Sequence, residues 1–292
     1  MIRYQFHRAE SLTDAVRVLE QEGGAARIVA GGTDLMVQVH ENDKRWQKMT
    51  CMLDITPLQK ELNYISEDAE HLYIGPLATH TEIERSALVQ KELPMLSEAC
   101  ATVGSPQIRN RGTIGGSIGN AFPASDPLPA LIAADANVRL LGPEGERKLL
   151  LADLYQGKGE LCLKRGELIR EFIIPKLPAG TTEAFSKLGR RKALAISRLN
   201  CAAALLIENG VIKEARIAPG CIFVLPMRVK KAEEMLIGKA PSEELFQKAG
   251  EAVSEVMIEK TGVRWSTAYK QPAVQEIVLR ALLMAAGMEV TA

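Results

Sequence analysis

The sequence predicts an α+β protein with two unequal parts, and three observations support this prediction. Short apolar strands alternate with amphipathic helices over residues 1–177. The segment PKLPAG at 175–180 then interrupts the pattern with two prolines and a glycine. Residues 178–292 read as antiparallel strands followed by helices. Because 292 residues are many for one core, we expect a domain boundary at this point, with lobes of about 1–56 and 57–177 before it.

The first lobe is expected to combine helices and short strands. Ser11 or Thr13 is a suitable N-cap for its first helix, and a Gly-Gly pair ends that helix. Thr33 or Asp34 is a suitable N-cap for the second helix. The expected order is a helix at 11–25, a strand at 26–32, a helix at 33–42 and a buried strand at 51–55.

The second lobe repeats this mixture on a larger scale. Gly142-Pro143 indicates a turn after a strand, and Pro175 ends the last strand of the lobe. The expected elements are a strand at 71–79, helices at 79–93 and 94–104, glycine turns with a short helix and a strand over 115–145, and a strand at 166–175.

The C-terminal part is expected to be an antiparallel sheet with three helices. Asn209-Gly210 is a strong two-residue hairpin signal, because both residue types tolerate positive φ. Strands are expected at 183–189, on both sides of this turn within 200–220, and at 221–225. Helices are expected at 227–238, 242–257 and 267–287.

Composition narrows the classes of function. The formal net charge is zero, with 36 basic and 36 acidic residues, so no overall field favours nucleic acid or an anionic membrane. The five cysteines form no C-x-x-C pair, which argues against a disulfide framework and favours a reducing compartment. The N-terminus lacks the apolar run of a signal peptide, and no apolar run reaches the length of a membrane span. We therefore expect a soluble cytoplasmic protein.

Two glycine-rich segments are candidates for ligand binding: AGGTD at 30–34 and GTIGGSIGN at 112–120. Glycine allows a ligand to approach the main chain closely, and the neighbouring hydroxyls of Thr33, Thr113 and Ser117 add donors. A diphosphate is the ligand such a pair of loops would suit. Taken singly, each segment also reads as an ordinary strand-terminating turn. Neither matches the nucleotide fingerprints G-x-x-x-x-G-K-[ST] or G-x-G-x-x-G.

The same segments resemble a known family. IVAGGTDL, followed by SPQIRNRGTIGG and TIGGSIGNAFPASD, is similar to the FAD-binding subunit of molybdenum hydroxylases, the xanthine dehydrogenase and carbon monoxide dehydrogenase group. The resemblance extends through KLGRRKALAIS to the C-terminal helices. It implies a two-lobed α/β FAD-binding domain of the PCMH type at 1–177 and a small α+β domain, with an antiparallel sheet and helices, at 178–292.

The resemblance also implies which residues line the cofactor. The first loop would wrap the FAD diphosphate, the second loop would hold it from the other side, and further positions would contact the flavin. These residues are Ile28, Val29, Ala30, Gly31, Gly32, Thr33, Asp34 and Leu35 in the first loop, Thr113, Ile114, Gly115, Gly116 and Ser117 in the second, and Val103, Asp126, Ile169 and Lys187 beyond them.

By the same resemblance, the chain is an electron-transfer flavoprotein subunit of an oxidoreductase. Its partners would be a molybdenum-cofactor large subunit and a small subunit with two-iron two-sulphur clusters, assembled as a dimer of heterotrimers. NAD is one acceptor that this arrangement implies. No catalytic acid or base is expected in this chain. Purines, other N-heterocycles, aldehydes and carbon monoxide are all compatible substrates of the complex.

Alternative interpretations accompany these assignments. Asp126 precedes an apolar run and is also a common type of N-cap, Lys187 also reads as a solvated strand lysine, and the basic residues Arg190, Arg191 and Lys192 read as an exposed turn or as a docking patch for an acidic partner. The histidines and cysteines lack metal-ligand or iron-sulphur spacing. A redox-inactive assembly module and a stand-alone flavin oxidoreductase of the vanillyl-alcohol-oxidase type are the competing functions.

Overall fold

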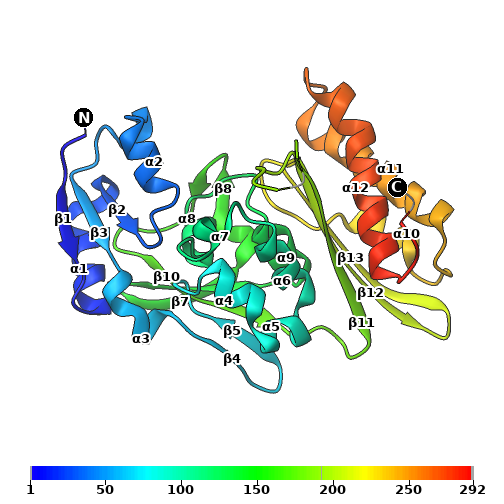
Figure 1. The fold of residues 1–292 in the computed structure, drawn as a ribbon, viewed down its shortest axis with the longest axis horizontal. Helices are drawn as coiled ribbons and strands as arrows, with labels where there is room; N and C mark the ends of the chain where they lie inside the picture. Colours follow the sequence, from blue (N-terminus) through cyan, green and yellow to red (C-terminus); the bar gives the residue numbers. More distant parts are fainter. Residues whose placement is uncertain (1, 192, 291–292) are drawn as a thin grey trace.

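The structure is a computed structural model that describes residues 2–191 and 193–290 (Figure 1). Lys192, the last residue of the expected basic turn, lies outside the described residues. Three sheets follow one another along the chain, and each is covered by helices that come mainly from the same region of sequence. The architecture is therefore α+β, as the sequence predicts.

The first sheet is parallel, with strand order β1-β3-β2. Ser11 caps the first helix, because its Oγ accepts a hydrogen bond of 3.1 Å from the N–H of Asp14. The strand β1 was not expected from the sequence. The elements of this lobe are β1 (Gln5–Arg8), α1 (Leu12–Glu22), β2 (Ala26–Val29), α2 (Leu35–His40) and β3 (Cys51–Asp54).

The second sheet is antiparallel, with strand order β4-β5-β10-β6-β7. Its strands are β4 (Ile65–Glu67), β5 (His71–Ile74), β6 (Asn137–Gly142), β7 (Gly145–Leu150) and β10 (Leu168–Pro175), and the short hairpin β8 (Tyr155–Gly157) and β9 (Glu160–Leu161) stands beside it. The helices of this region are α3 (Gln59–Leu62), α4 (His80–Arg85), α5 (Ala87–Glu92), α6 (Pro94–Ala101), α7 (Pro106–Arg109), α8 (Ile114–Gly119) and α9 (Pro127–Ala133).

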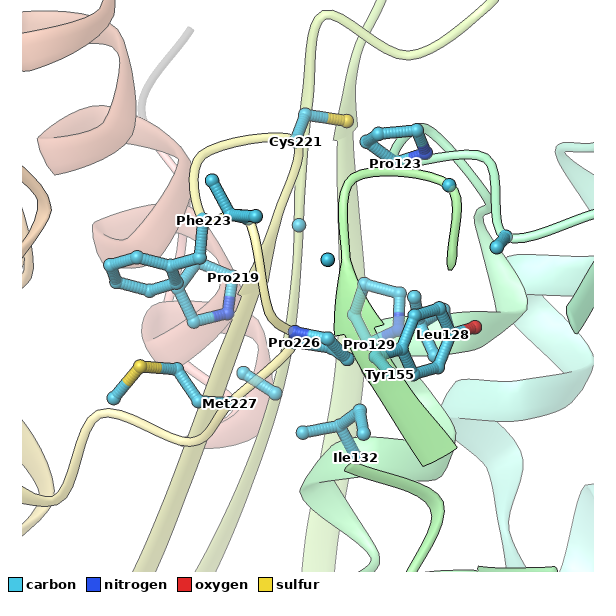
Figure 2. A pocket seen from close by; sticks show the side chains of 16 residues that line it. Pro123, Leu128, Pro129, Ile132, Tyr155, Pro219, Cys221, Phe223, Pro226 and Met227 are labelled. Carbon is cyan, nitrogen blue, oxygen red and sulfur yellow. The ribbon is translucent and has the colours of Figure 1, made fainter. Parts of the chain in front are cut away.

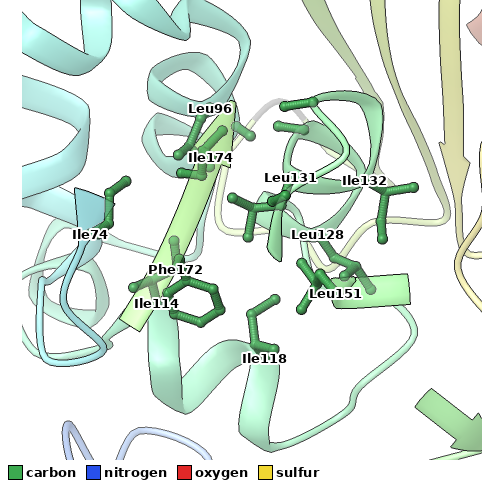
Figure 3. Close-up of a cluster of buried hydrophobic side chains, with 14 of the residues drawn as sticks. Ile74, Leu96, Ile114, Ile118, Leu128, Leu131, Ile132, Leu151, Phe172 and Ile174 are labelled. Carbon is green, nitrogen blue, oxygen red and sulfur yellow. The ribbon is translucent and has the colours of Figure 1, made fainter. Parts of the chain in front are cut away.

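Two features of this region differ from the sequence prediction. The single helix expected at 79–93 is broken at Ser86, whose backbone is extended and whose side chain caps α5. The glycine turn expected after residue 112 is largely helical, because α8 contains the glycines. Ile114 and Ile118 lie one turn apart on α8 and are fully buried, next to Phe172 in the main core (Figure 3). Burial of these two side chains holds a glycine-rich helix that has low intrinsic propensity.

The third sheet is antiparallel and is covered on both faces. Its strands are β11 (Thr181–Leu188), β12 (Leu199–Glu208) and β13 (Val211–Gly220), and its helices are α10 (Lys230–Leu236), α11 (Glu243–Thr261) and α12 (Thr267–Ala285). Along β12, Cys201 and Ala203 face α11 and α12, whereas Ala202 faces the core of the preceding domain. Burial on both faces explains why β12 reads as a continuous run of small apolar residues.

At the ends of β13, the sequence predicts the hairpin before the strand correctly but not the loop that follows it. Asn209 and Gly210 have φ of 52° and 74°, which confirms the two-residue hairpin. The strand expected at 221–225 is absent from the described structure, which has a loop there. Cys221 has a φ of 65°, so the chain leaves the sheet at this residue.

Glu183 of β11 lies where the third sheet meets α6. Its carboxylate accepts a hydrogen bond of 3.3 Å from the N–H of Met95, and Glu98 of α6 accepts one of 2.9 Å from the N–H of Phe185. Burial, together with the nearby Glu98 carboxylate, raises the pKa of Glu183 from 4.5 to about 7 in spite of the bond from Met95.

Glu183 should therefore make stability depend on pH. The folded protein holds this proton more tightly than the unfolded chain, so the contribution is full below pH 4.5 and is lost as the pH rises through about 7. We compare the free energy of unfolding of Glu183→Gln with that of the wild type at two pH values. Between about pH 4 and about pH 8 this difference should shift by roughly 1–3 kcal/mol in favour of the variant. Urea unfolding at both pH values measures this. Glu214→Gln, exposed on β13, is the control, and equal pH dependence in both variants would refute the assignment.

Candidate functional site

The two glycine-rich segments meet directly in the structure. A Cβ on Gly31 would overlap the carbonyl oxygen of Arg111 and lie 2.9 Å from the Cα of Gly112. Gly32 has a φ of 72°, a conformation that other residues rarely adopt. Gly31 is therefore bare first of all because another segment of the chain packs against it.

The first loop presents a run of free backbone donors. The backbone N–H groups of residues 31–35 donate to no acceptor among the described residues, although the carbonyl of Gly32 accepts a hydrogen bond from the N–H of Met36. Five successive backbone donors without protein acceptors are available to an anion such as a phosphate group. The loop thus fits a diphosphate group by its own geometry.

The second loop does not present its N–H groups in the same way. Ile114 and Gly115 donate to the carbonyls of Ala78 and Pro76 at 3.0 and 2.9 Å. The N–H of Gly116 donates to Thr113 Oγ1 at 3.0 Å, and that of Ser117 donates to the Thr113 carbonyl at 2.9 Å. These N–H groups already donate hydrogen bonds within the protein, so the second loop, unlike the first, has no free backbone donors at residues 114–117. Sequence reasoning treated them alike and missed this asymmetry.

Asp34 and Asn120 link the two loops through their side chains. The amide of Asn120 donates to Asp34 Oδ2 at 2.8 Å, and Gln38 donates to Asn120 Oδ1 at 3.5 Å. Asp34 occupies the expected N-cap position of α2, but its carboxylate makes no capping hydrogen bond to that helix. Asn120, which the sequence prediction omitted, instead holds the first loop onto the end of α8.

Asp126 lies at the junction of the two domains and is 5% exposed. Its Oδ2 accepts a hydrogen bond of 2.6 Å from Lys187 Nζ and one of 3.3 Å from Thr102. Its Oδ1 accepts from Ser197 at 2.5 Å and from Asn200 at 2.9 Å. Asp126 occupies the N-cap position of α9, but its side chain makes no capping bond, so that alternative is wrong. The carboxylate joins the domains instead.

Lys187 is part of this buried network and is not a solvated lysine. Its ammonium also donates to the carbonyl of Thr102 at 2.9 Å, and the side chain is 13% exposed. Ser197 and Asn200 complete the network, and sequence reasoning missed both. Their only sequence signal was the RRKALAIS segment, which ends at Ser197.

The remaining predicted residues fall into two groups. Val103 follows the Thr102 carbonyl that binds Lys187, and its own carbonyl accepts from Arg109 at 3.3 Å. The others place their apolar side chains in hydrophobic clusters, so only their backbone atoms could contact a ligand. These residues are Ile28, Val29, Leu35, Ile114 and Ile169. Ile169 pairs with Leu140 in the second sheet.

His80 is a further polar residue beside the loops that sequence reasoning did not select. Its N–H donates to the Gly112 carbonyl at 3.0 Å, and its ring Cδ2 lies 3.2 Å from the point where Gly112 would carry a Cβ. The hydroxyl of Thr33 lies 3.4 Å from the same point. Burial, followed by the charge of Arg109, lowers the pKa of His80 to about 4. The imidazole is therefore neutral at pH 7.

A small apolar hollow with a cavity volume of about 30 Å³ opens between the domains, beside this network (Figure 2). Pro123, Leu128 and Pro129 line one side, and Pro219, Cys221 and Pro226 line the other. Its walls offer almost no charged group, which distinguishes it from the loop site. Within residues 2–191 and 193–290, no group of histidine, cysteine and acidic side chains is arranged to hold a metal ion. The same residues include no helix that is long and apolar enough to cross a membrane.

The two-domain α+β fold and the free donors of the first loop are the features of a protein that binds a cofactor through its diphosphate. Comparison with known families identifies the cofactor. Residues 2–177 match the family described as FAD binding domain in molybdopterin dehydrogenase, and residues 183–285 match the CO dehydrogenase flavoprotein C-terminal domain. The chain therefore belongs to the FAD-binding subunits of the molybdenum hydroxylase family, and its cofactor is FAD.

Similar proteins support the assignment along the whole chain. The nicotinate dehydrogenase FAD-subunit of Eubacterium barkeri is 34% identical over 94% of this chain and 93% of that protein. The carbon monoxide dehydrogenase medium chain of Hydrogenophaga pseudoflava is 30% identical over 96% of both. A solved structure of carbon monoxide dehydrogenase from the same organism, which lacks the Mo-pyranopterin moiety, superposes with a TM-score of 0.90 at 30% identity, covering 98% and 99% of the two chains. The chain is thus a flavoprotein subunit of an oxidoreductase.

The contact at Gly31 gives a first test of the site. Gly31→Ala forces the first loop away from Arg111, and overpacking of this kind costs about 1–3 kcal/mol. We expect bound FAD per chain, measured by flavin absorbance after reconstitution, to fall at least several-fold. Gly119→Ala is the matched control, because its Cβ would meet nothing within 4 Å. If Gly31→Ala retains as much flavin as Gly119→Ala, the loop contact does not shape the site.

The Asp126 network gives a second test. Asp126→Asn leaves the buried ammonium of Lys187 without its counter-charge, and breaking one side of a buried ion pair costs about 3–5 kcal/mol. We expect the double variant Asp126→Asn/Lys187→Met to recover part of that loss in urea unfolding. Additive losses in this double-mutant cycle would show that the two side chains do not depend on each other.

Proposed function

We propose that this chain carries electrons through FAD from an iron-sulphur partner subunit to a soluble acceptor, within a molybdenum hydroxylase complex. FAD supplies the redox chemistry, since a flavin accepts electrons singly and releases them as a hydride. The single observation that carries the proposal is the run of free N–H groups at residues 31–35, set against the backbone of a second glycine segment.

The chain's own residues have distinct roles in this proposal. The first loop binds the diphosphate through its backbone. On the opposite side of the diphosphate, Gly116 lets the backbone approach closely, and Thr113 and Ser117 offer hydroxyl groups. Asp126 and Lys187 fix the angle between the domains. The full proposed set is Ile28, Val29, Ala30, Gly31, Gly32, Thr33, Asp34, Leu35, Val103, Thr113, Ile114, Gly115, Gly116, Ser117, Asp126, Ile169 and Lys187.

The finer features of the complex are part of the same proposal. We propose a xanthine-dehydrogenase-like arrangement with a molybdenum-cofactor large subunit and a two-iron two-sulphur small subunit, NAD as an acceptor, and a dimer of heterotrimers. Two domains at 1–177 and 178–292, the former with lobes at about 1–56 and 57–177, are the proposed units. Free thiols at all five cysteines agree with a cytoplasmic location. In support, several similar proteins are named as subunits of larger dehydrogenases.

Rapid mixing tests the electron-transfer role. FAD-loaded chain, mixed without oxygen with the pre-reduced iron-sulphur subunit that copurifies with it, should lose its oxidised-flavin absorbance, and added NAD should restore that absorbance. Gly119→Ala protein serves as a variant control with an intact site. A chain that binds FAD but is not bleached by the reduced partner would be an assembly module instead. A chain that binds no FAD would refute the proposal altogether.

A further inference from the structure

Three connections gather at one end of the third sheet. They are residues 189–198 between β11 and β12, residues 221–229 between β13 and α10, and residues 262–270, which lead from α11 into the first turn of α12. Figure 1 shows them together where β11 stops, beside the N-terminal end of α12. We refer to these three segments as the docking edge.

Large apolar side chains on the docking edge point into solvent. Trp265 is 96% exposed, Val263 is 82% exposed and Ile196 is 70% exposed. Further exposed apolar side chains on the same segments are Leu194, Val224, Leu225 and Tyr269. Clusters of exposed apolar residues with tryptophan, tyrosine and arginine are typical of the energetic centres of protein interfaces.

Two contacts join the three segments into one surface. Lys270 Nζ donates a hydrogen bond of 2.6 Å to the carbonyl of Cys221, which ties α12 to the second segment. The thiol of Cys221 lies 3.8 Å from the carbonyl of Ser197, which ties the second segment to the first. The exposed apolar residues therefore belong to neighbouring segments of a single edge.

The first segment is held in a defined shape that exposes its apolar residues. The guanidinium of Arg191 donates to the carbonyl of Leu194 at 2.6 and 3.1 Å, and the N–H of Arg198 donates to the Leu188 carbonyl at 2.8 Å. Leu194 has a φ of 55°, which costs about 1–2 kcal/mol for a residue with a branched side chain. The chain thus accepts backbone strain in a conformation that leaves Leu194 and Ile196 in water.

The docking edge is strongly basic although the whole chain is neutral. Among the described residues its three segments contain six basic side chains and no aspartate or glutamate, against totals of 36 and 36 for the chain. One of the six, Arg228, is paired with Asp135 and Glu233, which leaves five basic side chains for the edge. Arg190, Arg191, Arg198 and Arg264 are all exposed. Such a charge distribution favours an acidic partner surface and makes association dependent on salt.

The docking edge adjoins the candidate FAD site. Ser197, the last residue but one of the first segment, donates to Asp126 at 2.5 Å. The hollow in Figure 2 is lined on one side by residues 221–227 of the edge and on the other by residues 121–132 near α8. A redox partner seated on this edge would therefore lie next to Asp126 and the segment that follows α8.

From these observations we infer that the docking edge binds the electron-donating iron-sulphur subunit through an acidic surface with an apolar centre. This inference rests on the proposed function and adds the contact surface to it. Trp265 and Ile196 supply the apolar contact, and the exposed arginines set the orientation and rate of association.

The test uses the native complex, purified through a tag on this chain. In Trp265→Ser/Ile196→Ser and in Arg190→Ser/Arg191→Ser, we expect the ratio of iron to FAD to fall about ten-fold, which corresponds to about 1.4 kcal/mol of lost affinity. The arginine variant should lose iron at lower salt than the wild type. Ile237→Ser and Lys213→Ser, exposed at other places on the same domain, are the matched controls and should keep the wild-type ratio.

The outcomes separate this inference from the proposed function. FAD content and thermal stability at the wild-type level show that each variant is folded. If the folded edge variants keep the wild-type iron-to-FAD ratio, the inference is wrong. It is equally wrong if those variants keep the ratio but bind NAD or phosphatidylserine vesicles less tightly. A wild-type chain that carries FAD but never copurifies with iron contradicts the proposed function, whatever the variants do.

Discussion

The close approach of two backbones at Gly31 and Gly112 is the constraint on which the cofactor site depends. It brings the end of a parallel strand in the first lobe against a segment of the second lobe that is about 80 residues further along the chain. A side chain at Gly31 would separate them. The free N–H groups of the first loop lie next to the second loop only because this contact is made. Binding of a diphosphate therefore depends on the packing between the two lobes.

A second constraint joins the two domains. Asp126 begins α9 in the FAD-binding domain, while Lys187, Ser197 and Asn200 come from the third sheet and its first connection. A buried carboxylate with four donors is stable only while both domains are in place, because each donor that is lost leaves a buried polar group unsatisfied. The same network fixes Ser197, and so it holds the first segment of the docking edge. The cofactor site and the proposed partner surface therefore share one anchor.

Much of the fold follows from local signals in the sequence. Ser11 and Ser242 cap the helices that they were expected to precede or begin, and Asn209-Gly210 makes the expected hairpin. These features depend on residues within a few positions of one another, which is why the sequence predicts them. The apolar run of β12 was also informative, because a strand buried on both faces has no polar alternation.

The features that were not predicted depend on distant partners. The 221–225 segment has the composition of a strand, but the positive φ of Cys221 turns the chain away from the edge strand β13 before the segment can pair with it. The roles of Asn120, Ser197 and Asn200 depend on carboxylates 71 or more residues away. Composition could also not distinguish the free donors of the first loop from the consumed donors of the second, since both loops contain glycine pairs beside threonine.

The central claim is that FAD is held by the backbone of the first loop. Amide hydrogen exchange of the full chain, with and without FAD, tests this most directly. We expect the N–H groups of residues 31–35 to exchange fast without FAD and slowly with it, whereas those of residues 114–117 are protected in both states. Protection that appears on FAD addition only at residues 114–117, with residues 31–35 unchanged, would show that the first loop does not hold the cofactor.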